Sequence, residues 1–136
     1  MRFGSVHNVT RDACLGTHIL IADGWRARLR GYLGRREPEQ HEGILLLPCS
    51  SIHMLGVRFA LDVVFLDSEM RVLALHEAVQ PGFSARSHPG AAATLELRAG
   101  RVRETHTAVG DVLEIQELGT HDAVLPAAAS FKGDRP

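Results

Sequence analysis

The stretch CSSIHMLGVRFALDVVFLD, residues 49–67, decides the fold expected for this chain. Its second half, LDVVFL at residues 61–66, is apolar on both faces that an extended strand would present, apart from Asp62. A strand that is apolar on both faces is covered on both sides, so this segment predicts a central strand of a sheet. The thiol of Cys49 and the imidazole of His53 precede the strand and mark the segment as a candidate site.

Other short strands are predicted on both sides of this segment. The turn DSEM joins the central strand to the next one in a hairpin. The other strand-like runs lie at residues 6–23 (two short runs), 44–47, 71–79, 94–98 and 112–118. A doubly wound α/β fold is excluded, because it needs helices between parallel strands. The sequence predicts a mainly β protein, a compact β-sandwich or squat barrel (jelly-roll-like) with one short side helix.

The single predicted helix lies in GWRARLRGYLG, residues 24–34, and ends at Gly34. Four apolar side chains fall on one side of this helix, which predicts a stripe that packs on the sheet. They are Trp25, Leu29, Tyr32 and Leu33. The other face carries arginines and predicts either a solvated surface or a docking face for an anionic partner. These arginines stand at positions 26, 28, 30, 35 and 36.

Composition and charge place the chain among ordinary soluble globular proteins. One domain is expected over residues 1–119, with a flexible tail at residues 120–136. The net charge of −1 gives no general attraction to nucleic acid, and no aromatic residues interleave with the arginines. The apolar runs are too short to cross a membrane, and the N-terminus does not read as a secretory signal. We therefore expect a cytoplasmic protein, monomeric or weakly dimeric, that binds neither nucleic acid nor membranes.

The cysteines and histidines show no metal-binding pattern. Cys14 and Cys49 make no CxxC pair, and each is expected to be a free thiol in a reducing compartment. The histidines have no HxH or HExxH spacing. Cys49 and His53 would lie about 13 Å apart along an extended strand, too far apart for two ligands of one zinc ion. We therefore expect no metal and no cofactor.

Three motifs in the same order resemble the domain-of-unknown-function 192 family of prokaryotes. They are RGYLGR at residues 30–35, IHMLGVRFALDVVFLD at residues 52–67 and LELRAG…VGD at residues 95–111. The resemblance implies a compact, mainly β fold related to jelly-roll sandwiches, and no settled activity. Ala60 departs from the family pattern at a position usually held by proline, and Met70 at one commonly held by glycine. The second departure indicates that this hairpin turn need not have a positive φ angle.

Two hypotheses about function follow from the polar residues. The first is a non-catalytic accessory domain that binds a small polar or anionic ligand, or a protein partner, in a cleft near the segment from His53 to Asp62. Its candidate residues are Trp25, Arg30, Cys49, His53, Met54, Arg58 and Asp62. The second is a hydrolytic or metal-assisted enzyme that uses Cys49 or His53 with Asp62. No GxSxG elbow or cysteine-protease signature surrounds these residues.

Asp62 is the most informative of the candidates. It shares a predicted strand face with Val64 and Leu66, where an unpaired carboxylate would be costly. The expected solution is architectural: the carboxylate accepts backbone N–H bonds and fixes the loop at residues 56–58. A basic neighbour would instead make Asp62 part of a pocket wall.

Overall fold

The computed structural model describes residues 2–118, which form nine strands and two short helices. In chain order these are β1 (Arg2–Asn8), β2 (Ala13–Ala22), α1 (Trp25–Arg30), β3 (Glu42–Leu46), β4 (Ser51–His53), β5 (Leu61–Leu66), β6 (Val72–Val79), β7 (Ala85–Ser87), β8 (Ala93–Arg98), α2 (Arg101–Glu104) and β9 (Leu113–Leu118). The tail predicted at residues 120–136 lies outside the described residues. Within residues 2–118, no helix has the length and apolar character needed to cross a membrane.

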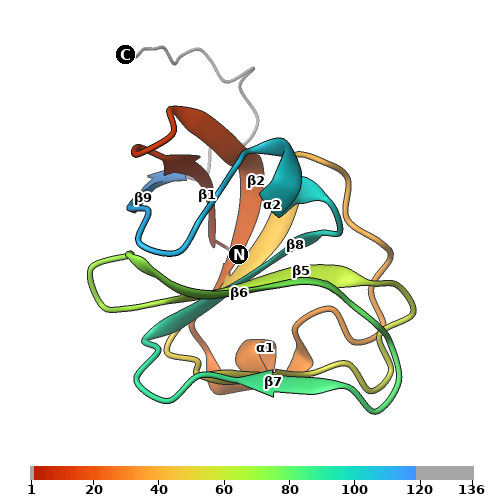
Figure 1. Ribbon diagram of the computed structural model, residues 1–136. Helices are drawn as coiled ribbons and strands as arrows, with labels where there is room; N and C mark the ends of the chain where they lie inside the picture. Colours follow the sequence, from red (N-terminus) through yellow and green to blue (C-terminus); the bar gives the residue numbers. More distant parts are fainter. Residues whose placement is uncertain (1, 119–136) are drawn as a thin grey trace.

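Seven strands form one curled sheet in the order β6-β5-β8-β3-β2-β1-β9, and β4 pairs with β7 in a separate two-stranded sheet (Figure 1). Strands β2 and β3 are parallel, whereas the other neighbouring pairs are antiparallel. The edge strands β6 and β9 approach one another at an isolated bridge between Arg71 and Val112, and the sheet is not closed. The mainly β class is therefore confirmed. Of the two predicted arrangements, the squat barrel does not apply because the sheet is not closed, and α2 is a second short helix beside the predicted one.

The curled sheet encloses one apolar core and carries a second core on its outer face. Strand β5 contributes to both: Val64 and Leu66 belong to the inner core, and Leu61, Val63 and Phe65 belong to the outer core. Every residue of β5 is buried, which confirms the prediction of a central strand covered on both sides. The alternation of side chains along a strand therefore separates two environments that lie only one residue apart in sequence.

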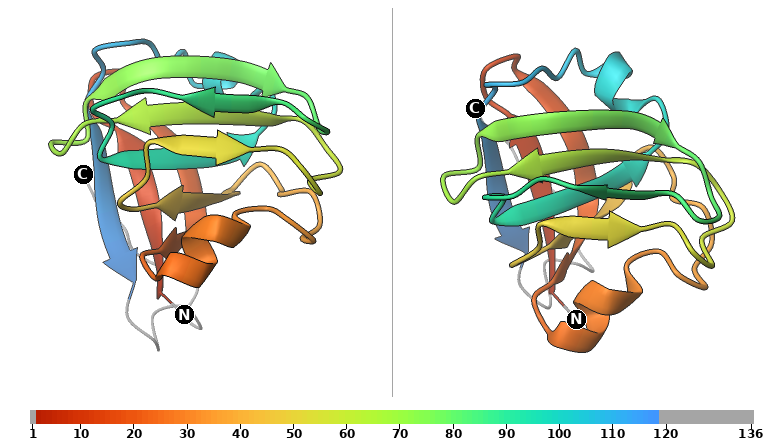
Figure 2. Two further views of the ribbon diagram at one scale, coloured as in Figure 1. Left: turned by 90° about the horizontal axis from the view of Figure 1, so that it is seen from below. Right: turned by 60° about the horizontal axis from the view of Figure 1, so that its bottom comes forward.

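A layer made of β7, β4 and α1 covers the outer core. Both views of Figure 2 show β4 between β7 and α1, against the outer face of the large sheet. Ile52 in β4, Met54 just after it and Tyr32 after α1 are buried in the outer core. The sequence did not predict β4 and β7 as strands, because each has only three residues and alternates with exposed positions.

Helix α1 is shorter than the sequence predicted, and most of its apolar stripe is exposed. The helix ends at Gly31, whose φ of 47° breaks the helical backbone, rather than at Gly34. Tyr32 is buried as expected, but Trp25 and Leu29 are 61% and 65% exposed. A helix of six residues rises only about 9 Å, too little for a full stripe to reach the sheet.

The β5–β6 hairpin is present, and Met70 lies in its turn. The carboxylate of Asp67 accepts hydrogen bonds of 2.9 Å from the backbone N–H groups of Glu69 and Arg71, which shapes the turn. Met70 has a φ of 65°, so the turn has a positive φ angle although methionine stands where the family commonly has glycine. Its side chain packs against the inner core, which holds this residue in a left-handed conformation that glycine adopts more easily.

Candidate ligand-binding pocket

A pocket of about 400 Å³ lies between α1 and the β4–β7 sheet, a size typical of sites for small molecules. Residues 28–32 form one wall, and residues 51–53 and 85–87 form the other. The large sheet supplies the floor through Leu46 of β3 and Glu96 of β8, both of which are buried. Three parts of the fold that are distant in sequence therefore meet at this pocket.

Glu96 is the unusual residue of the pocket. Its neighbours Leu95 and Leu97 point into the inner core, so Glu96 faces the outer side, opposite Val63 in the ladder between β5 and β8. Glu96 is only 3% exposed, and its Oε1 atom has no hydrogen-bond partner among the described residues. Burial raises the pKa of Glu96 to about 7, and the positive charge of Arg35 opposes this rise. Near neutral pH, a large fraction of Glu96 is therefore an uncharged carboxylic acid.

The backbone at the end of α1 closes over the Glu96 carboxyl group. A β-carbon on Gly31 would lie 2.9 Å from Oε1 of Glu96, so no larger residue fits there without a shift. The positive φ of Gly31 also favours glycine. The Nε–H of Arg35 donates a 2.8 Å hydrogen bond to the carbonyl of Gly31 and holds this turn in place. The sequence RGYLGR therefore builds the side of the pocket that touches Glu96.

Three arginines give the pocket a positive charge. Arg28, Arg30 and Arg86 line it, and each donates one hydrogen bond to a backbone carbonyl, at 2.7, 3.0 and 2.8 Å respectively. None of the three has a carboxylate within 4.0 Å in the part of the chain that the structure describes. Because a guanidinium group carries five N–H donors, most of these donors remain free for a ligand.

This arrangement is suited to an acceptor-rich, anionic group. Guanidinium donors recognise carboxylates and phosphates with charge-assisted, often bidentate hydrogen bonds. A neutral Glu96 can add one O–H donor from the floor, whereas an ionised Glu96 would repel an anion. The pocket therefore combines a fixed positive rim with a floor whose charge changes near neutral pH.

The structure brings two of the seven predicted site residues into this pocket, Arg30 and His53. Trp25 lies on α1 outside the pocket lining, with the guanidinium of Arg26 5.2 Å from the centre of its ring. Met54 is fully buried in the outer core, where it fills space and does not face a ligand.

Cys49 and Arg58 also lie outside the pocket lining. Cys49 is half-buried, and its thiol donates to the carbonyl of Ser51 over 3.1 Å. Arg58 is exposed in the connection between β4 and β5. Among residues 2–118, no three His, Cys, Asp or Glu side chains converge in a way that could hold a metal ion.

Asp62 is placed on the other side of β5 from the pocket. Its carboxylate accepts hydrogen bonds from the backbone N–H groups of Ala78, Gly100 and Val102 at 2.8, 3.1 and 2.9 Å. Asp62 therefore has the architectural role expected from its burial, but it fixes the end of β6 and the start of α2 rather than the loop at residues 56–58. The enzyme hypothesis needs Asp62 beside Cys49 or His53, and the structure does not bring them together.

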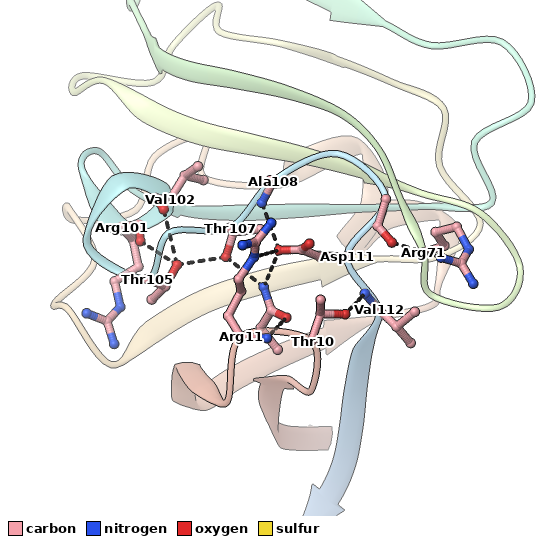
Figure 3. A network of polar contacts seen from close by, with 12 residues as sticks. Thr10, Arg11, Arg71, Arg101, Val102, Thr105, Thr107, Ala108, Asp111 and Val112 are labelled. Atoms are coloured by element: carbon pink, nitrogen blue, oxygen red, sulfur yellow. Dashed lines mark hydrogen bonds and ion pairs between the residues drawn. The ribbon is translucent and has the colours of Figure 1, made fainter.

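A second buried polar cluster surrounds Asp111 (Figure 3). The Asp111 carboxylate accepts hydrogen bonds from Arg11, Asn8 and the backbone N–H of Ala108 at 2.9, 3.0 and 2.9 Å. Burial by itself raises the pKa of Asp111, but these hydrogen bonds and the charge of Arg11 outweigh it and lower the pKa to about 2. This cluster ties β1 to the segment before β9.

Sequence reasoning missed Glu96, Gly31, Arg28 and Arg86 as pocket residues. In the run TLELR, a glutamate that alternates with leucines predicts a strand with a solvated outer face. Only the layer of β4, β7 and α1 buries that face, and two of these elements are too short to predict. One sequence signal was available, namely Gly31 in the motif RGYLGR. The family resemblance includes this motif, but the sequence alone assigned no role to its glycine.

Comparison with known proteins supports the fold. A protein of unknown function from Novosphingobium aromaticivorans DSM 12444 is 20% identical, with a TM-score of 0.71 over 82% of this chain and 83% of that one. A proposed transcription regulator from Sinorhizobium meliloti 1021 is 22% identical, with a TM-score of 0.73 over 84% of this chain and 92% of that one. At these identities the likeness shows the fold alone. A comparison with curated proteins gives no match.

The family is shown by its sequence profile. The profile of the family DUF192, described as "Uncharacterized ACR", matches residues 6–115. The matched range contains all three motifs noted in the sequence, including Gly31 in the first and Glu96 in the third. The resemblance predicted from these motifs is thereby confirmed, and the chain belongs to the DUF192 family.

Proposed function

We propose that this domain is a non-catalytic binding protein whose pocket holds a small polar molecule with an anionic group. One observation carries the proposal: Glu96 lines the floor of a pocket that arginines surround, and its buried Oε1 atom has no hydrogen-bond partner among residues 2–118. Buried polar atoms in folded proteins are almost always paired, so an unpaired one on a residue that lines a pocket indicates a missing partner. A ligand oxygen would satisfy Glu96, and the same ligand's negative charge would satisfy Arg28 and Arg30.

The charge pattern supports an anion over a cation. Arg28, Arg30 and Arg86 bring three positive charges to the pocket, and the one acidic side chain there is partly neutral because burial raises the pKa of Glu96 to about 7. A cation would meet repulsion from the rim and little attraction from the floor.

The cytoplasmic location expected from the sequence belongs to the same proposal. The thiols of Cys14 and Cys49 are both free, which is usual in a reducing compartment. Fractionation of the native host, followed by detection of the chain with an antibody, would test this part. Recovery of the chain outside the cytoplasm would contradict it.

Thermal shift with a panel of inorganic phosphate, acetate, succinate and citrate, near pH 6, tests the binding proposal. A ligand of the folded state raises the melting temperature by mass action. We expect at least one member of the panel to stabilise the protein and Arg30→Gln to weaken its binding roughly tenfold or more, the effect of losing one charge-assisted hydrogen bond.

Arg103→Gln is the matched control, because the Arg103 side chain is 86% exposed and Arg103 is not among the pocket residues. This variant should bind the same compound as the unaltered protein does. Equal loss of binding in both variants, or no stabilisation by any anion in the panel, would refute the proposed function.

A further inference from the structure

Strand β4 has one edge paired with β7 and one edge free. The N–H of Met54 donates to the carbonyl of Ser84 over 2.9 Å, and the N–H of His88 donates to the carbonyl of Ser50 over 2.9 Å. In an antiparallel ladder, hydrogen-bonded pairs alternate with pairs that are not hydrogen-bonded. Ile52 is therefore hydrogen-bonded to β7, whereas the residues on either side of it direct their backbone groups away from β7.

Those residues are Ser51 and His53, whose register partners in β7 are Ser87 and Ala85. The carbonyl of Ser51 accepts a hydrogen bond from the thiol of Cys49. The N–H of Ser51 and both the N–H and the carbonyl of His53 have no partner among the described residues. Such a row of unpaired groups on an edge strand is a template for another extended chain.

The free edge of β4 faces α1, with the pocket between them. In both views of Figure 2, α1 lies on the side of β4 opposite to β7, and residues 28–32 and 51–53 line the same pocket. A chain paired with β4 would therefore pass beside Arg28 and Arg30 and over Glu96. These groups favour an acidic side chain at that point, for the reasons given for an anionic ligand.

We propose that the ligand is an extended peptide segment with an acidic side chain, which adds to the free edge of β4 as a third strand and places its carboxylate among Arg28, Arg30 and Glu96. This inference rests on the proposed function and specifies its ligand. Strand addition supplies affinity through main-chain hydrogen bonds, and the pocket supplies specificity through one side chain.

The edge of the large sheet at β9 is a poorer place for the same peptide. That strand carries Glu114 and Glu117, and Arg2, the basic residue beside it, is already paired with Glu117. An acidic peptide would be repelled there, whereas the unpaired guanidinium groups beside β4 attract it. The positive charge and the free backbone groups coincide at β4.

The test uses the full chain and the peptide acetyl-Ser-Thr-Glu-Thr-Ser-amide, titrated by NMR near pH 6, with succinate as the small-molecule comparison. Two further peptides carry N-methyl groups, one at both threonines and the other at the glutamate. Alternate residues of a strand direct their N–H groups to opposite sides, so only one of the two methylated peptides can still pair with β4. We expect that peptide to bind nearly as well as the parent and the other to bind roughly tenfold or more weakly.

His53→Pro tests the same contact from the protein side, because proline removes the free N–H at position 53 without removing a hydrogen bond to β7. We expect His53→Pro to lose the parent peptide. If His53→Pro fails to fold, the two methylated peptides still decide the question.

The outcomes separate this inference from the proposed function. Binding of succinate without binding of the parent peptide would overturn strand addition and leave an anion-binding pocket. Equal affinities of the two methylated peptides, whether high or low, would also overturn strand addition. Absence of binding by both succinate and the parent peptide would count against both proposals.

Discussion

The backbone of Gly31 and the carboxyl group of Glu96 are fitted to one another, with 2.9 Å between Oε1 of Glu96 and the place where a β-carbon on Gly31 would stand. This contact joins the end of α1 to the middle of β8. Glu96 also lines the pocket, so the contact lies at the pocket floor. Its energetic consequences can be measured.

Gly31→Ala should destabilise the fold more than Gly34→Ala does. Both glycines have a positive φ, 47° and 71°, which costs a side chain about 1 kcal/mol or more. A β-carbon at position 34 meets nothing within 4 Å, whereas one at position 31 meets the Glu96 carboxyl group. Urea denaturation would measure both costs. In a Glu96→Ala background the cost of Gly31→Ala should fall, and an unchanged cost would show that the two residues are not coupled.

Glu96→Gln should change how stability depends on pH. The folded protein holds the Glu96 proton up to a pKa of about 7, and the unfolded chain releases it near 4.5. The folded state therefore binds more protons between these values, and stability falls as pH rises from about 4.5 to about 7. Above that range, Glu96→Gln should be more stable than the unaltered protein by about 3 kcal/mol, from 2.5 pKa units (7 − 4.5) at about 1.36 kcal/mol each.

The measurement is urea denaturation at pH values between about 4 and 8. Glu114→Gln is the control, because Glu114 is exposed and should leave the pH profile unchanged. Parallel profiles for Glu96→Gln and the unaltered protein would mean that the carboxyl group is not desolvated as the structure indicates.

Asp62→Ala should cost about 3 kcal/mol of stability, since it leaves three backbone N–H groups without their acceptor. Asp62→Asn should cost less, because one side-chain oxygen remains to accept hydrogen bonds. His53→Ala should change stability by less than about 0.5 kcal/mol, because His53 is exposed. A neutral Asp62→Ala in urea denaturation would show that the carboxylate does not hold the end of β6 and the start of α2.

Asp111 should make the fold sensitive to acid. Its pKa is lowered from 3.8 to about 2, so its stabilising contribution is complete above about pH 4 and is lost as pH falls towards 2. Asp111→Asn should therefore be clearly less stable than the unaltered protein at pH 7, and the difference should shrink near pH 2. Arg11→Gln removes one partner and should show the same trend in denaturation midpoints. A difference that stays constant with pH would contradict this account.

The sequence predicts the centre of the fold well and its outer layer poorly. Strand β5 is recognisable because six consecutive buried residues leave little choice of environment. Strands β4 and β7 are not recognisable, because three residues give no period and their burial depends on contacts with α1 and the large sheet. The candidate site lies in this outer layer, which explains why the sequence placed it only approximately.

Individual residues show the same limit. Asp62 and Glu96 are both buried acidic residues inside strands, but the sequence pattern marked only Asp62 as buried. Asp62 is satisfied by backbone groups from two distant segments, whereas Oε1 of Glu96, next to Gly31, has no hydrogen-bond partner among the described residues. Only the residue on the side of the sheet that α1 covers can line the pocket. That information is carried by tertiary contacts and not by local pattern.

The parallel pairing of β2 with β3 allows one wall of the pocket to vary without a change in the large sheet. Parallel neighbours cannot be joined by a tight turn, so residues 23–41 cross from the end of one strand to the start of the other. This crossing adds no strand to the large sheet, yet it supplies Arg28, Arg30 and Gly31. We therefore expect that residues 23–41 can be exchanged: a crossing segment transplanted from another family member should change the ligand preference of the pocket, while the ladders on either side keep their register.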